Sequence, residues 1–274
     1  FKTDVPCGAS LYVKEIGTDD HYILSDKKYP VVFEYAGQDV AKVEIDVNDG
    51  EAIENTLKRG KVSGWKVDQD GFELGGAVIG LFCFDETEFT EETAFLVTES
   101  NEIGYFEFDK VPVGNWLVRE IAPPAAFVLT EETFPVEITE DGQTIEIRIE
   151  NQIIKGIAET TKVDADYPEN KLSGAVFEIY ADVDNNGEFD AEIDQLVGEM
   201  TETEPGLYQM KDLVWGSYFL HEKESPEIFP ARRKLLPFSI TENGAVVRDR
   251  NRSWRGLPQQ SADRLPEGGK DSRR

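Results

Sequence analysis

The feature that most constrains the fold is an internal repeat with a period near 100 residues. A block in which Gly is followed by an aromatic residue and then by Glu occurs at Gly114–Glu120 and again at Gly216–Glu222, and a related block ends at Glu15. The three Glu residues lie 105 and 102 positions apart. The chain is therefore an array of similar modules, each with its own core.

Further landmarks set the module boundaries. Lys66-Val-Asp and Lys162-Val-Asp open two copies, and Asn55, Asn151 and Asn251 stand at corresponding places near the module ends. We predict complete modules at 60–155 and 156–251. We expect residues 1–59 to be the C-terminal part of a truncated module, and residues 252–274 to be a basic, disordered tail.

The local pattern of the modules is typical of β-strands. Apolar and polar residues alternate with period two in Thr144–Glu150 and Val43–Val47, and turn residues such as Glu140-Asp-Gly142 and Asn48-Asp-Gly50 follow or separate these runs. No stretch has a sustained helical period. About 100 residues of short strands per module predicts an all-β fold of tandem Greek-key β-sandwiches.

Composition excludes several classes of function. The chain has 28 Lys and Arg against 55 Asp and Glu, a net charge of −27, which repels nucleic acids and anionic lipid surfaces. The longest weakly polar run, Ala77–Phe84, is too short to cross a bilayer. Cys7 and Cys83 fall in different modules, so we expect neither a disulfide framework nor a zinc site.

Strand alternation points polar side chains inward. Glu120 shares a strand face with Trp116 and Val118, and the same parity applies to Glu222, to Glu15 and to Asn151. Burial without partners would cost several kcal/mol, so these groups need partners. One explanation is a hydrogen-bonded core pair. The other adds the recurrent Lys, whose amine is driven towards neutrality in a dry core and could attack the Asn amide beside a protonated Glu. The residues alone do not decide between these two explanations.

The order Lys-Val-Asp, Leu-x-Gly-Ala-Val, Gly-x-aromatic-x-Val-x-Glu and terminal Ile-Glu-Asn resembles the Cna protein B-type (SpaA-like pilin) domains of Gram-positive surface proteins, across residues 8–251. The resemblance implies prealbumin-like sandwiches with spontaneous isopeptide bonds. By position, Glu120 would promote a bond between Lys66 and Asn151, and Glu222 one between Lys162 and Asn251. Glu15 and Asn55 would form a pair whose Lys precedes Phe1.

This resemblance suggests a structural stalk segment of an extracellular, cell-wall-anchored adhesin or pilin. Its partners would be neighbouring repeat domains, and a host or matrix ligand bound through a tip domain outside this sequence. Two alternatives stay open: modules that bind such a ligand themselves, or an accessory domain of a secreted enzyme. The expected chemistry is a single self-cross-linking event, so we predict no enzyme.

One acidic loop matches the first half of a calcium-binding loop, with oxygen ligands at Asp182, Asp184, Asn186 and Asp190 and a Gly at position 6. Position 12 is Ile193, so Asp194 or Glu192 would have to supply the last ligand. The alternative is a solvated acidic hairpin. Calcium is the one cofactor that the sequence suggests.

The two histidines argue against conventional catalysis. Parity places His221 on the strand face opposite Glu222, and His21 precedes a Tyr22 that we expect in a core. A Ser-His-Asp arrangement is therefore not predicted.

Overall fold

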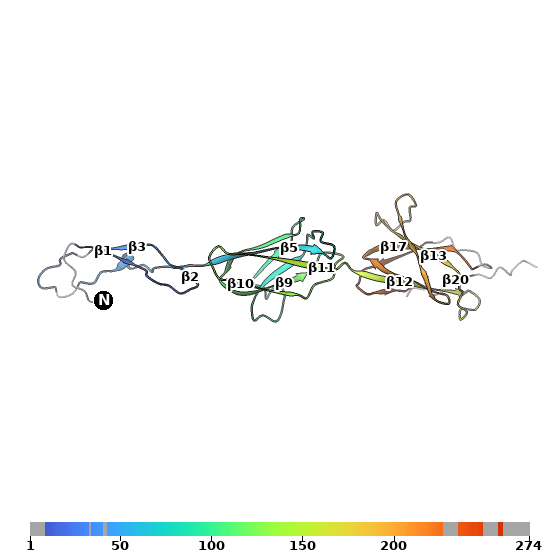
Figure 1. Ribbon diagram of the computed structural model, residues 1–274, viewed down its shortest axis with the longest axis horizontal. Coiled ribbons are helices and arrows are strands. Elements are labelled where there is room, and N and C mark those ends of the chain that lie inside the picture. Colours follow the sequence, from blue (N-terminus) through green and yellow to red (C-terminus); the bar gives the residue numbers. More distant parts are fainter. Residues whose placement is uncertain (1–8, 33, 41–42, 227–234, 249–256, 260–274) are drawn as a thin grey trace, which may run out of the picture. The chain divides into compact units, whose positions relative to one another are not determined.

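The structure is a computed structural model that describes residues 9–32, 34–40, 43–226, 235–248 and 257–259. These residues are almost entirely in strands and loops (Figure 1). They divide into two compact units. One comprises the described residues up to Val67 with Gly71–Ala122 and Thr130–Glu150, and the other comprises Asp68–Asp70, Pro123–Leu129 and the described residues from Asn151 onward. The prediction of an all-β fold is confirmed.

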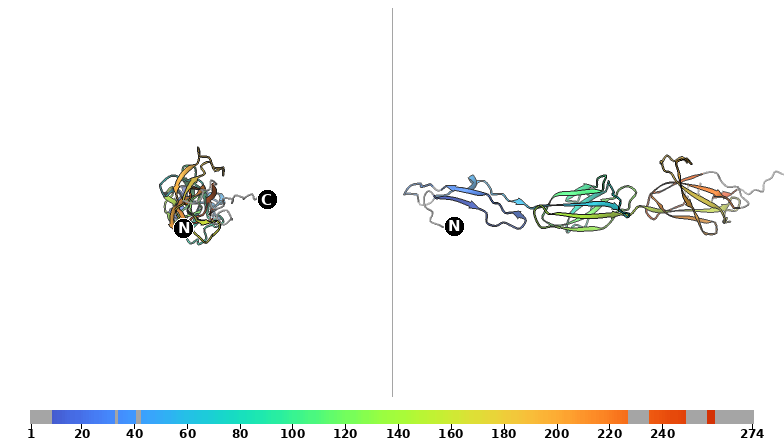
Figure 2. Two further views of the ribbon diagram at one scale, coloured as in Figure 1. Left: turned by 90° about the vertical axis from the view of Figure 1, so that its right-hand side faces the viewer. Right: turned by 45° about the horizontal axis from the view of Figure 1, so that its top comes forward.

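The second module is a sandwich of two sheets. One sheet has the strand order β10-β9-β6-β7 and the other β11-β5-β8, and Figures 1 and 2 show them as two layers. The strands are β5 (Arg59–Asp68), β6 (Val78–Cys83), β7 (Leu96–Glu99), β8 (Tyr105–Pro112), β9 (Gly114–Ala122), β10 (Thr133–Ile138) and β11 (Thr144–Asn151). The inward residues of both sheets, among them Val62, Leu81 and Phe106, form one core.

The third module repeats this plan. One sheet has the order β14-β13-β17-β18 and the other β15-β16-β12-β19, with β20 pairing separately to β12. The strands are β12 (Lys155–Asp164), β13 (Val176–Ala181), β14 (Gln195–Glu199), β15 (Thr201–Glu204), β16 (Leu207–Val214), β17 (Gly216–Glu224), β18 (Leu236–Ile240), β19 (Val246–Val247) and β20 (Leu257–Gln259). Phe177, Tyr208 and Leu220 lie in its core.

The first module forms two small antiparallel pairs, β1 (Ser10–Lys14) with β3 (Lys28–Val32) and β2 (Tyr22–Ile23) with β4 (Thr56–Leu57). The strand predicted over Val43–Val47 is wrong for the described part, because residues 43–46 are irregular and Val47–Gly50 form a 3-10 helix, η1. The inward face predicted for β1 is also wrong: Leu11 is 37% and Val13 42% exposed. The sheet that contains β1 has two strands, too few to bury a face.

The C-terminal segment differs from expectation at one place. Residues 257–259, within the expected disordered tail, form β20, which pairs in parallel with β12.

The described residues contain no helix of the length and apolar character that a membrane span requires. Cys83 is an exposed free thiol, and Cys7 lies outside the described residues.

Candidate functional site

A buried Lys–Glu pair lies in the core of the second module. The Lys66 Nζ of β5 is 3.5 Å from the Glu120 Oε1 of β9, and neither side chain has exposed surface. Lys66 Nζ also donates to the carbonyl oxygen of Ile149 at 3.3 Å, and Glu120 Oε2 accepts a hydrogen bond from the Thr130 amide at 3.0 Å. The predicted burial of Glu120 is confirmed, and the direction of Lys66, which alternation left open, is inward.

Burial changes the acid–base chemistry of this lysine. Removal of water lowers the pKa of Lys66, and the nearby charge of Glu120 opposes that shift without cancelling it. A lowered pKa raises the fraction of neutral amine at physiological pH. A neutral amine is a nucleophile, so burial favours the nucleophilic form of this side chain.

Asn151 is the last residue of β11, a strand that neighbours β5 in its sheet. Its side chain is 1% exposed, and its Nδ2 donates to the carbonyl oxygen of Val128 at 2.8 Å. Ile149, whose carbonyl oxygen accepts from Lys66 Nζ, precedes it by two positions on the same inward face. The predicted inward direction of Asn151 is confirmed.

The backbone of both buried lysines is held by the same pair of hydrogen bonds. The Lys66 amide donates to the Gly104 carbonyl and the Lys66 carbonyl accepts from Leu74, at 2.7 and 2.9 Å. Lys162 repeats this arrangement with Gly206 and Leu172, at 2.8 and 2.9 Å.

Sequence reasoning missed Gly104 and Gly206, whose carbonyl oxygens accept these hydrogen bonds from the two lysines. Gly104 has φ +74°, and a Cβ there would lie 2.4 Å from the Lys66 carbonyl oxygen. Gly206 has φ +71°, and a Cβ there would lie 2.8 Å from the Lys171 Cβ and 3.0 Å from the Lys162 carbonyl oxygen. Glycine is therefore required at both positions. A signal was available, because Gly104 and Gly206 are 102 positions apart, as are Glu120 and Glu222.

The third module repeats the buried pair. Lys162 Nζ lies 2.6 Å from Glu222 Oε1, and the two side chains are 0% and 1% exposed. Asn251, the predicted partner of Lys162, lies outside the described residues. In the described part, the strand register places Leu257 of β20 opposite Lys162.

The first module brings Glu15 and Asn55 together. Asn55 Nδ2 donates to Glu15 Oε1 at 2.7 Å, and the Ser25 amide donates to Glu15 Oε2 at 2.9 Å. Ser25 follows Glu15 by ten residues, as Thr130 follows Glu120, so the two carboxylates are held alike. The hydrogen bond from Asn55, with that from Ser25, lowers the pKa of Glu15.

The acidic loop between β13 and β14 gathers three of the five predicted calcium ligands. Oxygen atoms of Asp182, Asp184 and Asp194 lie within 4.8 Å of one another. Asp190 is not part of this group, and its Oδ1 accepts from the Glu192 amide, while the Asn186 Nδ2 donates to Asp184 at 2.7 Å. Carboxylates at this spacing suit a hard cation such as Ca²⁺.

The histidines lie outside the buried Lys–Glu pairs. His221 is half-buried, with Nδ1 3.6 Å from Glu178 Oε2, and His21 Nδ1 lies 2.5 Å from Asp19 Oδ1. The expectation that Tyr22 lies in a core is wrong, because it is 39% exposed. It belongs to the two-residue strand β2, which pairs with β4 alone.

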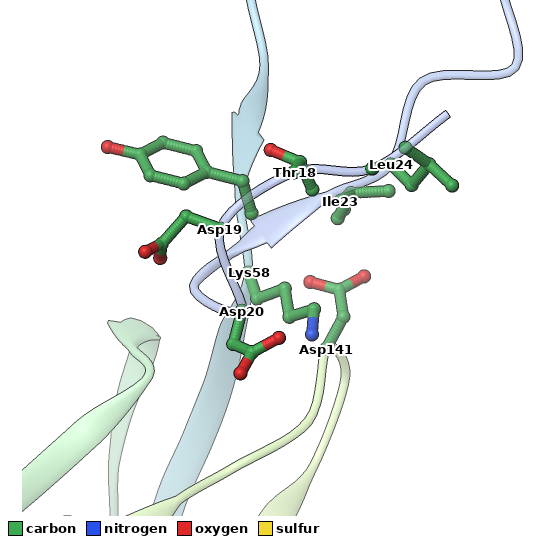
Figure 3. A pocket seen from close by; sticks show the side chains of 9 residues that line it. Thr18, Asp19, Asp20, Ile23, Leu24, Lys58 and Asp141 are labelled. Atoms are coloured by element: carbon green, nitrogen blue, oxygen red, sulfur yellow. The ribbon is translucent and has the colours of Figure 1, made fainter. Parts of the chain in front are cut away.

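An open hollow of about 560 Å³ lies in the first unit. Figure 3 shows Lys58 with its amine directed toward Asp141 and with Asp20 nearby, and the hollow is also lined by Asp19, Ile23 and Leu24. Its carboxylates outnumber its one amine, and it holds neither member of a buried Lys–Glu pair.

Two sandwiches with one strand plan and one buried Lys–Glu pair each define a tandem array of prealbumin-like domains. The SpaA family, described as a prealbumin-like fold domain, matches residues 60–153 and 156–252. The chain belongs to this family. Comparison with curated protein sequences gave no match.

Three solved structures are similar to this chain to different degrees, and the first shares its fold. The Bacillus anthracis TIE protein is 24% identical with a TM-score of 0.62, over 76% of this chain and 35% of its own. A streptococcal ancillary pilin is 22% identical with a TM-score of 0.34, over 95% and 77%. GBS52, the minor pilin of Streptococcus agalactiae, is 17% identical with a TM-score of 0.30, over 78% and 100%. The chain thus spans about a third of the length of the TIE protein.

Proposed function

We propose that this chain is a structural stalk segment of a surface adhesin or pilus of a Gram-positive cell wall, stabilised by isopeptide bonds that its own modules form. The observation that supports this most is the recurrence of a fully buried Lys–Glu pair, Lys66 with Glu120 and Lys162 with Glu222, in two successive sandwiches. Membership of the SpaA family agrees with a structural role.

The proposed reaction joins Lys66 to Asn151. The neutral amine of Lys66 attacks the side-chain carbonyl carbon of Asn151, and a protonated Glu120 polarises that carbonyl by donating a hydrogen bond. The new bond is between Nζ and Cγ, and the bond that breaks is between Cγ and Nδ2. Glu120 relays a proton from the attacking nitrogen to the leaving one, so ammonia departs and Glu120 ends as it began.

The bond would stabilise the module in two ways. It closes a loop of 85 residues, which restricts the unfolded chain by about 4–5 kcal/mol on the loop-entropy model used for disulfides. It also links β5, the first strand of the module, to β11, the last, so that tension applied at the module ends passes through a covalent bond. An amide also resists reduction, which suits an extracellular protein with few cysteines.

Stretching of single molecules tests this role. A bond between Lys66 and Asn151 excludes the intervening residues from extension, so unfolding of the second module should release little length in the parent chain. An Asn151→Ala variant should release roughly 290 Å at 3.4 Å per residue. Full release of this length by the parent chain would contradict the proposed stalk mechanism.

A further inference from the structure

An aromatic hollow lies on the third module, away from the buried Lys–Glu pair. It has a volume of about 350 Å³ and is lined by Tyr180, Phe189, Ala191, His221 and Leu235. Tyr180 and His221 come from β13 and β17, on the face of the sheet opposite the core residues Ile179 and Leu220. Phe189 comes from the loop that connects β13 to β14. This size is at the lower end of small-ligand pockets.

Aromatic rings form the walls of this hollow. The Phe189 ring lies 5.1 Å from the Tyr180 ring and 5.8 Å from the Phe219 ring, both edge to face. The Tyr180 and His221 rings are 6.4 Å apart. Such ring faces carry negative electrostatic potential and attract cations.

The second module shows what fills the same place. Arg119 pairs across the strands with Gly80 as His221 pairs with Glu178, so Arg119 and His221 occupy equivalent positions. There the Arg119 guanidinium carbon lies 4.6 Å from the centroid of the Phe89 ring, and Phe89 packs against Phe82 at 5.0 Å. The second module thus places its own guanidinium on its loop phenylalanine. The shorter His221 leaves this space open in the third.

The loop beside the hollow is acidic. It bears Glu188, Asp190 and Glu192 together with Phe189, and no Lys or Arg occurs between residues 172 and 210, whereas Arg232, Arg233 and Lys234 precede the lining residue Leu235 in the sequence. Beside the hollow, the 6% exposed Glu178 accepts from the Tyr180 hydroxyl and contacts Lys223 Nζ, both at 2.9 Å. Lys223 also pairs with Glu199 at 2.9 Å. Its charge is therefore offset by two carboxylates, and it does not repel an incoming cation.

We propose that this hollow binds an arginine side chain of a partner polypeptide, with the guanidinium against Phe189 and Tyr180, where Arg119 lies against Phe89 in the second module. A planar guanidinium matches ring faces better than a lysine ammonium does. The acidic loop adds long-range attraction. This recognition does not depend on the cross-link, so either proposal can fail alone.

The test uses the whole chain and the peptide Ac-Gly-Ser-Arg-Ser-Gly-amide as probe. Binding is followed by NMR shifts of the His221 and Tyr180 ring protons, and the control peptide has citrulline, the uncharged isostere, in place of Arg. We expect the Arg peptide to bind about tenfold more tightly than the citrulline peptide. Equal binding of the two peptides, or displacement of the Arg peptide by a neutral saccharide, would overturn the proposal.

Three variants locate the site. Phe189→Leu removes the ring and should abolish the difference between the peptides, and His221→Arg should abolish binding because its own guanidinium fills the hollow. Phe89→Leu, the matched change in the second module, should bind as the parent does. Melting curves confirm that each variant is folded. If Phe189→Leu and His221→Arg, both folded, bind the Arg peptide like the parent, the assignment is wrong.

Discussion

Lys66 Nζ lies 3.5 Å from Glu120 Oε1 in a part of the second module where neither side chain has any exposed surface. Burying two ionisable groups seldom adds net stability, because the desolvation cost can exceed the attraction between the charges. The third module nevertheless repeats the pair, with Lys162 Nζ 2.6 Å from Glu222 Oε1. The recurrence of this costly arrangement at corresponding positions agrees with the proposed cross-linking reaction.

Removal of Glu120 should destabilise the second module strongly. In Glu120→Ala, Lys66 stays buried without its carboxylate, which costs about 3–5 kcal/mol, and the loss of the cross-link adds a similar amount. Calorimetry of the whole chain measures the change. The control is Glu107→Ala, which removes an exposed carboxylate that pairs with Lys61 at 3.1 Å and should change stability little, because solvent screens an exposed pair. Equal effects of the two changes would contradict this role of Glu120.

Gly104→Ala should disturb the lysine through its backbone. An alanine there would adopt φ +74° and place its Cβ 2.4 Å from the Lys66 carbonyl oxygen. Gly142→Ala is the matched control, because Gly142 has φ +75° and no atom within 4 Å of the added Cβ. Both changes carry the left-handed backbone cost of about 1–2 kcal/mol. We expect Gly104→Ala to lose more stability in thermal melts than Gly142→Ala, and we expect only Gly104→Ala to lose cross-linking. Identical behaviour of the two variants would contradict a role of Gly104 in holding the Lys66 backbone.

Acid should break the contact between Glu15 and Asn55. Hydrogen bonding lowers the pKa of Glu15 below its usual 4.5 in the folded chain, so the contact contributes stability above that value and loses it as pH falls through the lowered pKa. NMR of the Ser25 amide proton should report this transition below pH 4.5. In Asn55→Ala the pH midpoint of this transition should rise, because Glu15 loses the hydrogen bond from Asn55. In the control Asn48→Ala the midpoint should not change, since the side-chain amide of Asn48 donates to backbone carbonyls and not to Glu15. A midpoint unchanged in Asn55→Ala would disprove the assignment.

Calcium should raise the melting temperature if the acidic loop binds it. Binding to the folded state alone adds about 2.7 kcal/mol at a hundredfold excess over the dissociation constant. The shift should disappear in Asp182→Ala, whose carboxylate belongs to the group with Asp184 and Asp194. It should persist in Glu188→Ala, a change of an exposed residue of the same loop. An equal shift of the melting temperature in Asp182→Ala and Glu188→Ala would show that Asp182 does not bind calcium.

Alternation within strands was enough to predict which way Glu120 and Asn151 point, because β9 and β11 keep regular burial patterns. Glu222 also points as predicted, although Tyr218, Phe219 and Leu220 of β17 are all buried. Lys66 could not be assigned in this way. The pairing of β5 with β8 shifts register between Gly60 and Val62, and Lys66 and Val67 are both buried although they are adjacent. An irregular strand breaks the relation between sequence parity and direction.

Features that combine segments distant in the sequence could not be predicted from the sequence either. The aromatic hollow depends on Phe189 of a loop meeting Tyr180 and His221 of two strands, and no local pattern fixes how that loop folds back. The exposed face of β1 escaped prediction for a related reason, since burial depends on what covers a sheet as well as on its own alternation.

The mass of the intact, denatured protein tests the central claim most directly. A bond between Lys66 and Asn151 lowers the mass by one ammonia relative to the sequence, and a second ammonia is lost if Lys162 joins Asn251. Glu120→Ala should restore one ammonia, and a digest of the parent should contain a branched peptide that joins β5 to β11. A well-folded parent chain with the full sequence mass, and with Lys66 and Asn151 in separate peptides, would contradict the account.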